Sequence, residues 1–166
     1  LGDIPVLVVG VRFATTLTAD GEFEAISLDK AAERASRTPH LVLNRVQVAR
    51  RLGLPQIRAF DLLELYSFVR PARYCLPTVG GLLTALVIDK ETGDAEDECL
   101  RLRDIADRLL VDMTSETYRN RAGGGRVAMM MAKAGWAWGP LVLSVIETYA
   151  ANSRVYDCVV VQALPE

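Results

Sequence analysis

Residues 6–26 of the sequence, VLVVGVRFATTLTADGEFEAI, hold the pattern that decides the fold. The run at residues 6–9 is apolar and mostly β-branched, which predicts a buried strand, and residues 11–18 predict a second strand rich in threonine. Asp20-Gly21 predicts a hairpin turn, because both residue types tolerate a positive φ. Residues 22–26 alternate in polarity, with Phe23 and Ala25 facing inward or the reverse. We therefore expect three antiparallel strands at the start of the chain.

Capping residues mark the helices that follow. Ser27 is expected to cap a helix that ends before Pro39, Asn44 to cap one that Gly53 ends, and Asp61 to cap a third. Short apolar runs between these helices predict two further strands, at residues 41–43 and 57–60. Later helices are expected at residues 78–87, 95–113, 127–134 and 141–149, and a last strand at residues 154–161. The predicted fold class is α/β, with three antiparallel and then parallel strands flanked by helices.

The composition bounds the possible functions. The chain has 166 residues, of which 51% are apolar and 24% charged, as in ordinary globular domains. Its net charge is −2, whereas a stand-alone nucleic-acid binder usually has a basic excess. Tight DNA binding by this chain alone is therefore disfavoured.

Three cysteines, Cys75, Cys99 and Cys158, are widely spaced and form no C-x-x-C pair, so they predict packed thiols rather than a disulfide framework or a zinc site. No apolar run approaches the roughly 18 residues that a membrane span needs. We expect no membrane partner and a cytoplasmic location. The sequence begins at Leu1 without a methionine, and we expect it to be part of a longer polypeptide.

Several short stretches are similar to known segments of nucleases. Residues 12–17, RFATTL, match the segment Asp-x-Glu-Thr-Thr-Gly-Leu that the first strand of the DEDD proofreading exonucleases carries, with Arg12 and Ala14 in place of the acids. Asn44 matches a later His-Asn pair, and the second Asp of the family falls on Val48. Asp94-Ala95 is a remnant of the last motif, in which Asp89 takes the place of a His. Together with the order of elements, these stretches resemble a ribonuclease-H-like exonuclease domain.

A second resemblance covers nearly the whole chain. The segments FDLLEL (60–65), FVRPARYC (68–75) and AGWAWGP (134–140) resemble the N-terminal region of DinG-like ATP-dependent DNA helicases of alphaproteobacteria. The resemblance implies a degenerate exonuclease-like domain at residues 1–116 and a helical extension at residues 117–166. It also implies that a helicase motor of the same polypeptide, which uses ATP and Mg²⁺, lies beyond this segment. Residues 123–126, GGGR, lack the spacing of a phosphate-binding loop, so no cofactor is expected in this segment.

Two acids are candidates for a vestigial metal site, Asp61 and Asp94. Phosphodiester hydrolysis by two metal ions needs several converging carboxylates, and most of the matched acids have been replaced here. The alternative interpretation is that these acids are helix caps followed by first-turn acids, namely Asp61 with Glu64, and Asp94 with Glu96, Asp97 and Glu98. The only histidine, His40, is interpreted as a loop residue. We expect no catalytic residue.

Basic and aromatic residues suggest a weak contact with DNA. Arg70, Arg73, Tyr74 and Arg126 are the candidates for phosphate contacts and base stacking. Residues 123–125 are expected to form a flexible joint. Trp136 and Trp138 are two residues apart and cannot share a helical face, so one is a candidate for an exposed contact with the motor, while core packing is the alternative.

The sequence thus predicts a non-catalytic accessory domain of a DNA helicase that positions the motor or guides DNA. A divalent-metal 3′→5′ exonuclease with a rearranged site is the second hypothesis. A protein-interaction module that uses the tryptophan segment is the third.

Overall fold

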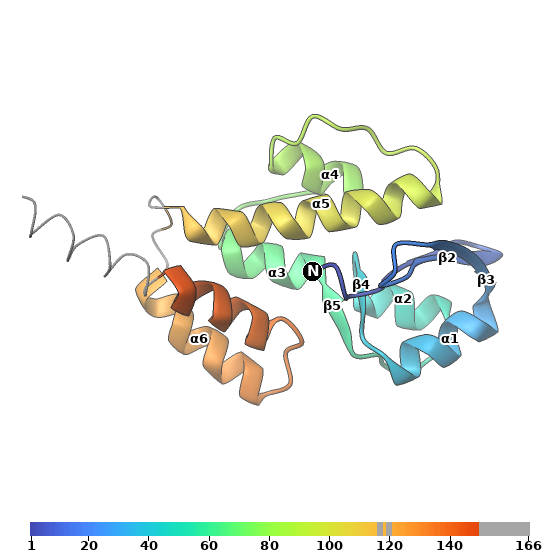
Figure 1. The fold of residues 1–166 in the computed structure, drawn as a ribbon, viewed down its shortest axis with the longest axis horizontal. Helices are drawn as coiled ribbons and strands as arrows, with labels where there is room; N and C mark the ends of the chain where they lie inside the picture. Colours follow the sequence, from blue (N-terminus) through green and yellow to red (C-terminus); the bar gives the residue numbers. More distant parts are fainter. Residues whose placement is uncertain (116–117, 119–120, 150–166) are drawn as a thin grey trace, which may run out of the picture. The chain divides into compact units, whose positions relative to one another are not determined.

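The computed structural model describes residues 1–115, 118 and 121–149 (Figure 1). The chain divides into two compact units, Leu1–Leu109 and Leu110–Glu166. This division lies within a long helix, earlier along the chain than the expected boundary after residue 116.

The first unit is built on one mixed sheet of five strands, in the order β3-β2-β1-β4-β5. The strands are β1 (Val6–Val9), β2 (Phe13–Leu17), β3 (Phe23–Ser27), β4 (His40–Val42) and β5 (Ala59–Asp61). The β2 strand is antiparallel to both β1 and β3, whereas β4 runs parallel to β1 and β5 runs parallel to β4. The predicted α/β class, with three antiparallel strands followed by parallel ones, is confirmed.

The hairpin between β2 and β3 forms as predicted, because Gly21 takes a φ of 87° that its missing side chain permits. Of the two orientations expected for β3, the structure has the one in which Phe23 and Ala25 face outward. Ile26 is buried, while Phe23 and Ala25 are exposed. Residues two apart on a strand share one face, so the pair at 23 and 25 points away from the core.

Five helices belong wholly or largely to this unit: α1 (Leu28–Arg37), α2 (Arg45–Arg51), α3 (Leu62–Val69), α4 (Val79–Ala85) and α5 (Ala95–Thr114). The predicted caps are in place. Ser27 accepts a hydrogen bond from the N–H of Lys30, and Asn44 and Asp61 each accept two from the first turn of their helices.

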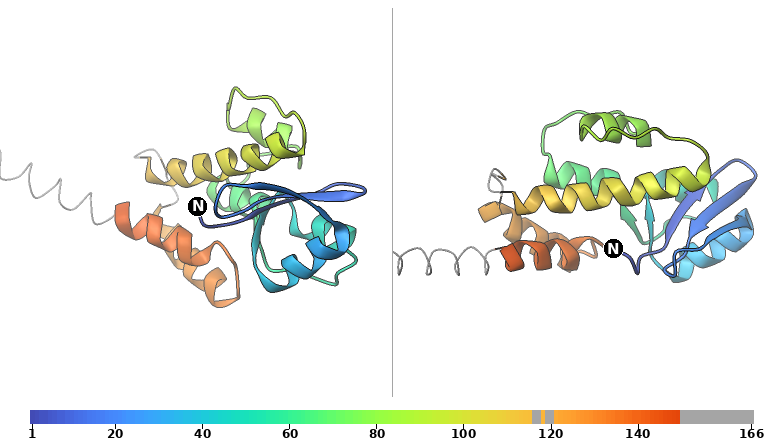
Figure 2. Two further views of the ribbon diagram at one scale, coloured as in Figure 1. Left: turned by 45° about the vertical axis from the view of Figure 1, so that its right-hand side comes forward. Right: turned by 45° about the horizontal axis from the view of Figure 1, so that its top comes forward.

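Helices cover both faces of this sheet (Figures 1 and 2). On one face, alanines of α1 and α2 pack against Leu7, Val9 and Ile26. On the other face lies α5, whose Cys99 thiol donates to the carbonyl of Thr15 and whose Arg103 side chain donates to that of Thr18. The sheet is therefore enclosed, and its centre is β1.

His40 is not a loop residue, as its place after Pro39 had suggested. It begins β4 and is only 4% exposed, and its Nδ1 lies 2.7 Å from the carbonyl oxygen of Thr38. Pairing of β4 with β1 and β5 draws it into the sheet. Burial lowers the pKa of the His40 imidazole, because the charged form is poorly solvated there.

The described part of the second unit consists of the end of α5, α6 (Arg121–Lys133) and a further helix at residues 139–149. Gly135, with a φ of 92°, lies in the turn between the last two helices. Trp138 is fully buried and Trp136 is 9% exposed, so both tryptophans pack in the core and the exposed-contact alternative is wrong. A Cβ on Gly139 would overlap Ala132, which shows how closely these two helices approach.

The expected flexible joint at residues 123–125 is also wrong, because these glycines lie inside α6. Gly124 is buried, and a Cβ on Gly125 would meet Ile146 at 3.9 Å. Packing against the following helix thus overrides the low helix propensity of glycine. The strand predicted at residues 154–161 lies outside the described residues. None of the described helices combines the length and apolar character that a bilayer crossing requires.

Candidate functional site

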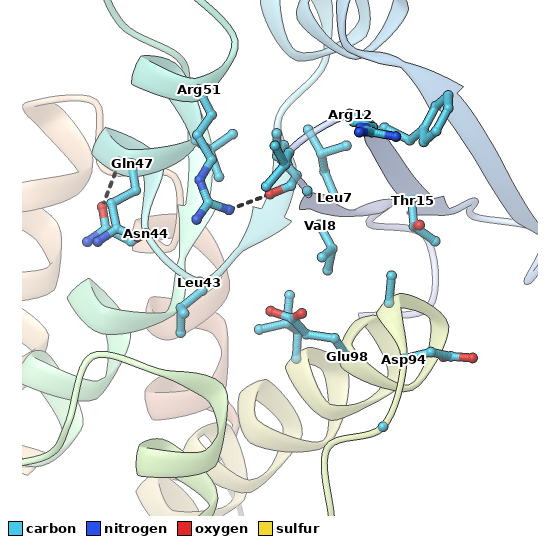
Figure 3. Close-up of a pocket in the computed structure, with 18 residues that line it drawn as sticks. Leu7, Val8, Arg12, Thr15, Leu43, Asn44, Gln47, Arg51, Asp94 and Glu98 are labelled. Atoms are coloured by element: carbon cyan, nitrogen blue, oxygen red, sulfur yellow. Dashed lines mark hydrogen bonds between the residues drawn. The ribbon is translucent and has the colours of Figure 1, made fainter.

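A cavity of about 460 Å³ opens in the first unit where β1 ends (Figure 3). Its wall is formed by β1, the start of β2, the segment after β4 with α2, and the start of α5. The side chains that line it include Val11, Arg12, Phe13, Asn44, Arg51, Asp94 and Glu98. Three separate segments of the chain, within residues 7–15, 43–51 and 93–102, therefore meet at the carboxyl end of the central strand.

The rim beside β1 and β2 is set by a tight turn. The N–H of Gly10 donates to the carbonyl of Phe13 at 2.9 Å, and a Cβ on Gly10 would lie 2.9 Å from the same oxygen. A glycine is therefore the residue that fits without displacement. The turn leaves Val11 91% exposed and Phe13 65% exposed at the cavity.

The α2 wall contributes a cation. Asn44 caps α2 through Oδ1, which accepts from the N–H of Val46 at 3.0 Å and of Gln47 at 3.1 Å. At the other end of this short helix, Arg51 extends into the cavity and its Nη1 donates to the carbonyl of Val9 (Figure 3). The guanidinium therefore lies at the very end of β1.

The α5 wall contributes two acids that behave differently. Oδ1 of Asp94 accepts from the N–H groups of Glu96 and Asp97, each at 3.0 Å, so Asp94 caps α5 as its alternative interpretation held. Glu98, one helical turn later, is half-buried and lines the cavity from the wall opposite Arg51 (Figure 3). Burial raises the pKa of the Glu98 carboxyl, and the positive charge of Arg51 acts in the opposite direction.

Glu98 and Arg51 were not among the predicted site residues. Sequence reasoning assigned Glu98 to the first-turn acids of α5, where a carboxylate favours the helix dipole. The spacing of the acids could have identified Glu98, because it lies four residues after Asp94 and therefore on the same helical face. Nothing local in the sequence brings Arg51 to the end of β1.

Asp61 lies apart from this cavity. It ends β5 and caps α3, accepting from the N–H of Leu63 at 2.9 Å and of Glu64 at 3.1 Å. Its other oxygen accepts from the N–H of Arg45 at 2.7 Å. The side chain is 3% exposed, and burial raises the pKa of this carboxyl while the three donors act against that change. The capping interpretation of Asp61 is confirmed.

Most positions matched to the nuclease motifs do line the cavity: Arg12, Asn44, Val48 and Asp94. The matched segment at residues 12–17 lies mainly in β2, the second strand predicted for residues 11–18, whereas the exonucleases it resembles carry this motif on their first strand. The apolar run that begins after Pro5 forms the central strand instead. Ala14 is fully buried and is not among the residues lining the cavity.

The donors at the cavity do not fit a pair of metal ions. Two-metal catalysis needs ions about 3.5–4 Å apart, held by several carboxylates. Here Asp94 and Glu98 line the same cavity as Arg12 and Arg51, whose charges oppose a metal cation. Nowhere among residues 1–115, 118 and 121–149 do three His, Cys, Asp or Glu side chains gather in a way that could hold a metal ion.

The predicted DNA-contacting residues fall into two groups. Arg70, Arg73 and Tyr74 lie on the loop after α3, where Tyr74 is 83% exposed, Arg73 is exposed and Arg70 is half-buried. Arg126 lies on α6 in the second unit and is exposed. The structure therefore brings three of the four together on one segment.

Comparison of the chain with protein-family models, with curated proteins and with solved structures gives no match. No relative therefore assigns a role to the cavity or to the loop after α3.

Proposed function

We propose that this chain is an accessory domain of a DNA helicase, of ribonuclease-H-like fold, that guides single-stranded DNA without hydrolysing it. The observation that carries the proposal is the charge pattern of the cavity. Arg51 extends into the place at the end of β1 where a nuclease of this kind would need carboxylates around metal ions. A guanidinium there opposes cation binding and leaves the cavity without a hydrolytic set.

The sheet supports the ribonuclease-H-like assignment. The sheet has the order β3-β2-β1-β4-β5, and β2 is the one strand that runs opposite to the others, in keeping with the element order on which the resemblance rests. The cavity lies outside the carboxyl end of the central strand, where ligands bind in many open α/β sheets. The resemblance of residues 60–75 and 134–140 to DinG-like helicases supplies the link to an ATP-driven motor in the same polypeptide.

The loop after α3 supports a contact with DNA. Exposed Tyr74 offers a ring on which a base can stack, and Arg73 one residue before it offers a cation for phosphate. With a net charge of −2 for the whole chain, such binding is expected to be weak and sensitive to salt. Weak binding suits a domain that guides a strand held mainly by a motor.

A nuclease assay tests the absence of hydrolysis. A 5′-labelled single-stranded oligonucleotide is incubated with the chain and Mg²⁺ or Mn²⁺, and we expect it to stay intact. Degradation that Glu98→Gln abolishes would contradict the proposal and establish the rearranged exonuclease instead. Glu33→Gln is the matched control, because Glu33 lies on α1 and is not part of the cavity wall.

An unwinding assay tests the link to a motor. In the full-length helicase, the double variant Arg73→Gln, Tyr74→Ala is expected to slow unwinding while ATP hydrolysis continues. Arg37→Gln serves as the control, because Arg37 is an exposed arginine at the end of α1. Unchanged unwinding by the double variant would remove DNA guidance from the proposal.

A further inference from the structure

The rim of the cavity offers a second place for DNA, distinct from the loop after α3. Phe13 is the first residue of β2 and is 65% exposed, although an aromatic side chain of this size is normally buried. Val11 beside it is 91% exposed. Two large apolar side chains therefore stand in solvent at the mouth of a cavity.

The backbone under these side chains is held in place. Phe13 pairs with Ser27 across the β2–β3 ladder, and its carbonyl accepts the hydrogen bond from Gly10 that closes the turn. A rigid aromatic platform loses little conformational entropy when a flat ligand stacks on it. Nucleobases have such a flat face, and stacking on aromatic side chains tolerates any of them.

Charge separates the rim from the interior. Inside the cavity, Arg51 and Glu98 attract each other and offset each other's charge. At the rim, Arg12 is exposed, and no ion pair joins it to another residue of the described chain. Arg12 directly precedes Phe13 and both line the cavity, so one short segment offers a cation for phosphate and a ring for a base.

We propose that the rim formed by Val11, Arg12 and Phe13 binds a nucleotide of single-stranded DNA, with its base on Phe13 and its phosphate on Arg12, and needs no divalent cation. The inference rests on the proposed function and extends it, because it names a second contact on the DNA path. In this arrangement the guanidinium of Arg12 supplies the positive charge that metal ions supply in a hydrolytic cleft. The phosphodiester bond stays intact because no hydroxide is generated beside it.

The test is fluorescence anisotropy of a labelled oligothymidylate with the whole 166-residue chain, at low salt and with EDTA or Mg²⁺. We expect the same affinity in both buffers. Phe13→Ala is expected to weaken binding about fivefold or more, the loss of one stacked base. Arg12→Gln is expected to make the dependence of log K on log salt shallower by about 0.7, the value for one phosphate of a single strand.

Matched controls separate this site from general effects. Phe23→Ala removes an exposed aromatic residue from β3, and Arg50→Gln removes an exposed arginine from α2, and neither residue lines the cavity. Both controls should bind as the unaltered chain does. Circular dichroism of each variant shows whether it is folded, and Phe13→Tyr, which keeps a ring, should restore binding.

The outcomes are distinct. If Phe13→Ala and Arg12→Gln bind like the controls while Tyr74→Ala loses affinity, the rim site is refuted and the proposed DNA guidance stands. Binding that EDTA abolishes also refutes the metal-free rim. If the unaltered chain binds no oligonucleotide even at low salt, DNA guidance itself fails.

Discussion

Replacing Asp61 by alanine should destabilise the first unit strongly, because three backbone N–H groups lose their acceptor together. Loss of the cap to Leu63 and Glu64 costs about 1 kcal/mol. The bond from the N–H of Arg45 is 2.7 Å long and ends on a carboxyl that is 3% exposed, and breaking such a charge-assisted bond costs about 2 kcal/mol. The expected loss in the free energy of unfolding is therefore about 3 kcal/mol.

Urea unfolding followed by far-ultraviolet circular dichroism measures this loss. With a slope of about 2 kcal/mol per molar urea, the midpoint should fall by about 1.5 M. Asp94→Ala is the matched control, since Asp94 caps α5 through two backbone N–H groups but is exposed. It should cost only about 1 kcal/mol. Equal losses in the two variants would refute the reasoning that burial and the bond from Arg45 make Asp61 structural.

Three further predictions concern other positions. Val87 has a φ of 55° and is 85% exposed, so Val87→Gly should relieve backbone strain and raise stability by about 1 kcal/mol, seen as a melting temperature about 3 °C higher. Burial lowers the pKa of His40 below its unfolded value, so the folded state favours the neutral ring and stability should fall as the pH drops below about 6.5. His40→Gln should flatten this pH dependence of stability, whose slope cannot exceed about 1.4 kcal/mol per pH unit for one proton. Trp138 is fully buried, so Trp138→Ala should destabilise the second unit by about 3 kcal/mol or more in thermal unfolding, and a variant as stable as the parent would place this ring outside the core.

The parts of the fold that could be predicted from the sequence are those that depend on residues close together in the chain. The caps at Ser27, Asn44 and Asp61 each depend on a side chain that bonds to the next helical turn, and all three are in place. Gly21 likewise sets its own turn. The strands are located to within a few residues because their apolar runs are short and sharply bounded.

The predictions that were wrong concern positions whose structure depends on residues distant in the chain. The glycines at 123–125 suggest a joint when read alone, but they lie inside α6, where Gly124 is buried and Gly125 lies near Ile146 of the helix at residues 139–149. His40 is drawn into β4 by pairing with two other strands. Both outcomes depend on tertiary contacts that no local propensity contains.

The candidate site shows the same limit. Asp61 and Asp94 are the sequence's candidates for a vestigial metal site, and both cap helices, as their alternative interpretation holds. The pair that faces across the cavity, Arg51 and Glu98, comes from α2 and α5 and meets only when both helices dock beside β1. Such a pair is a property of the assembled fold.

The buried position of Cys99 allows the opening of α5 from the sheet to be measured by thiol labelling. Its thiol is fully buried against β2, and burial raises the pKa of the thiol to about 12, so the reactive thiolate form is strongly disfavoured. A thiol reagent can therefore reach Cys99 only when α5 lifts off the sheet. The rate at which the reagent labels Cys99 therefore measures how often α5 opens. Comparing this rate with and without DNA shows whether a bound DNA strand suppresses the opening.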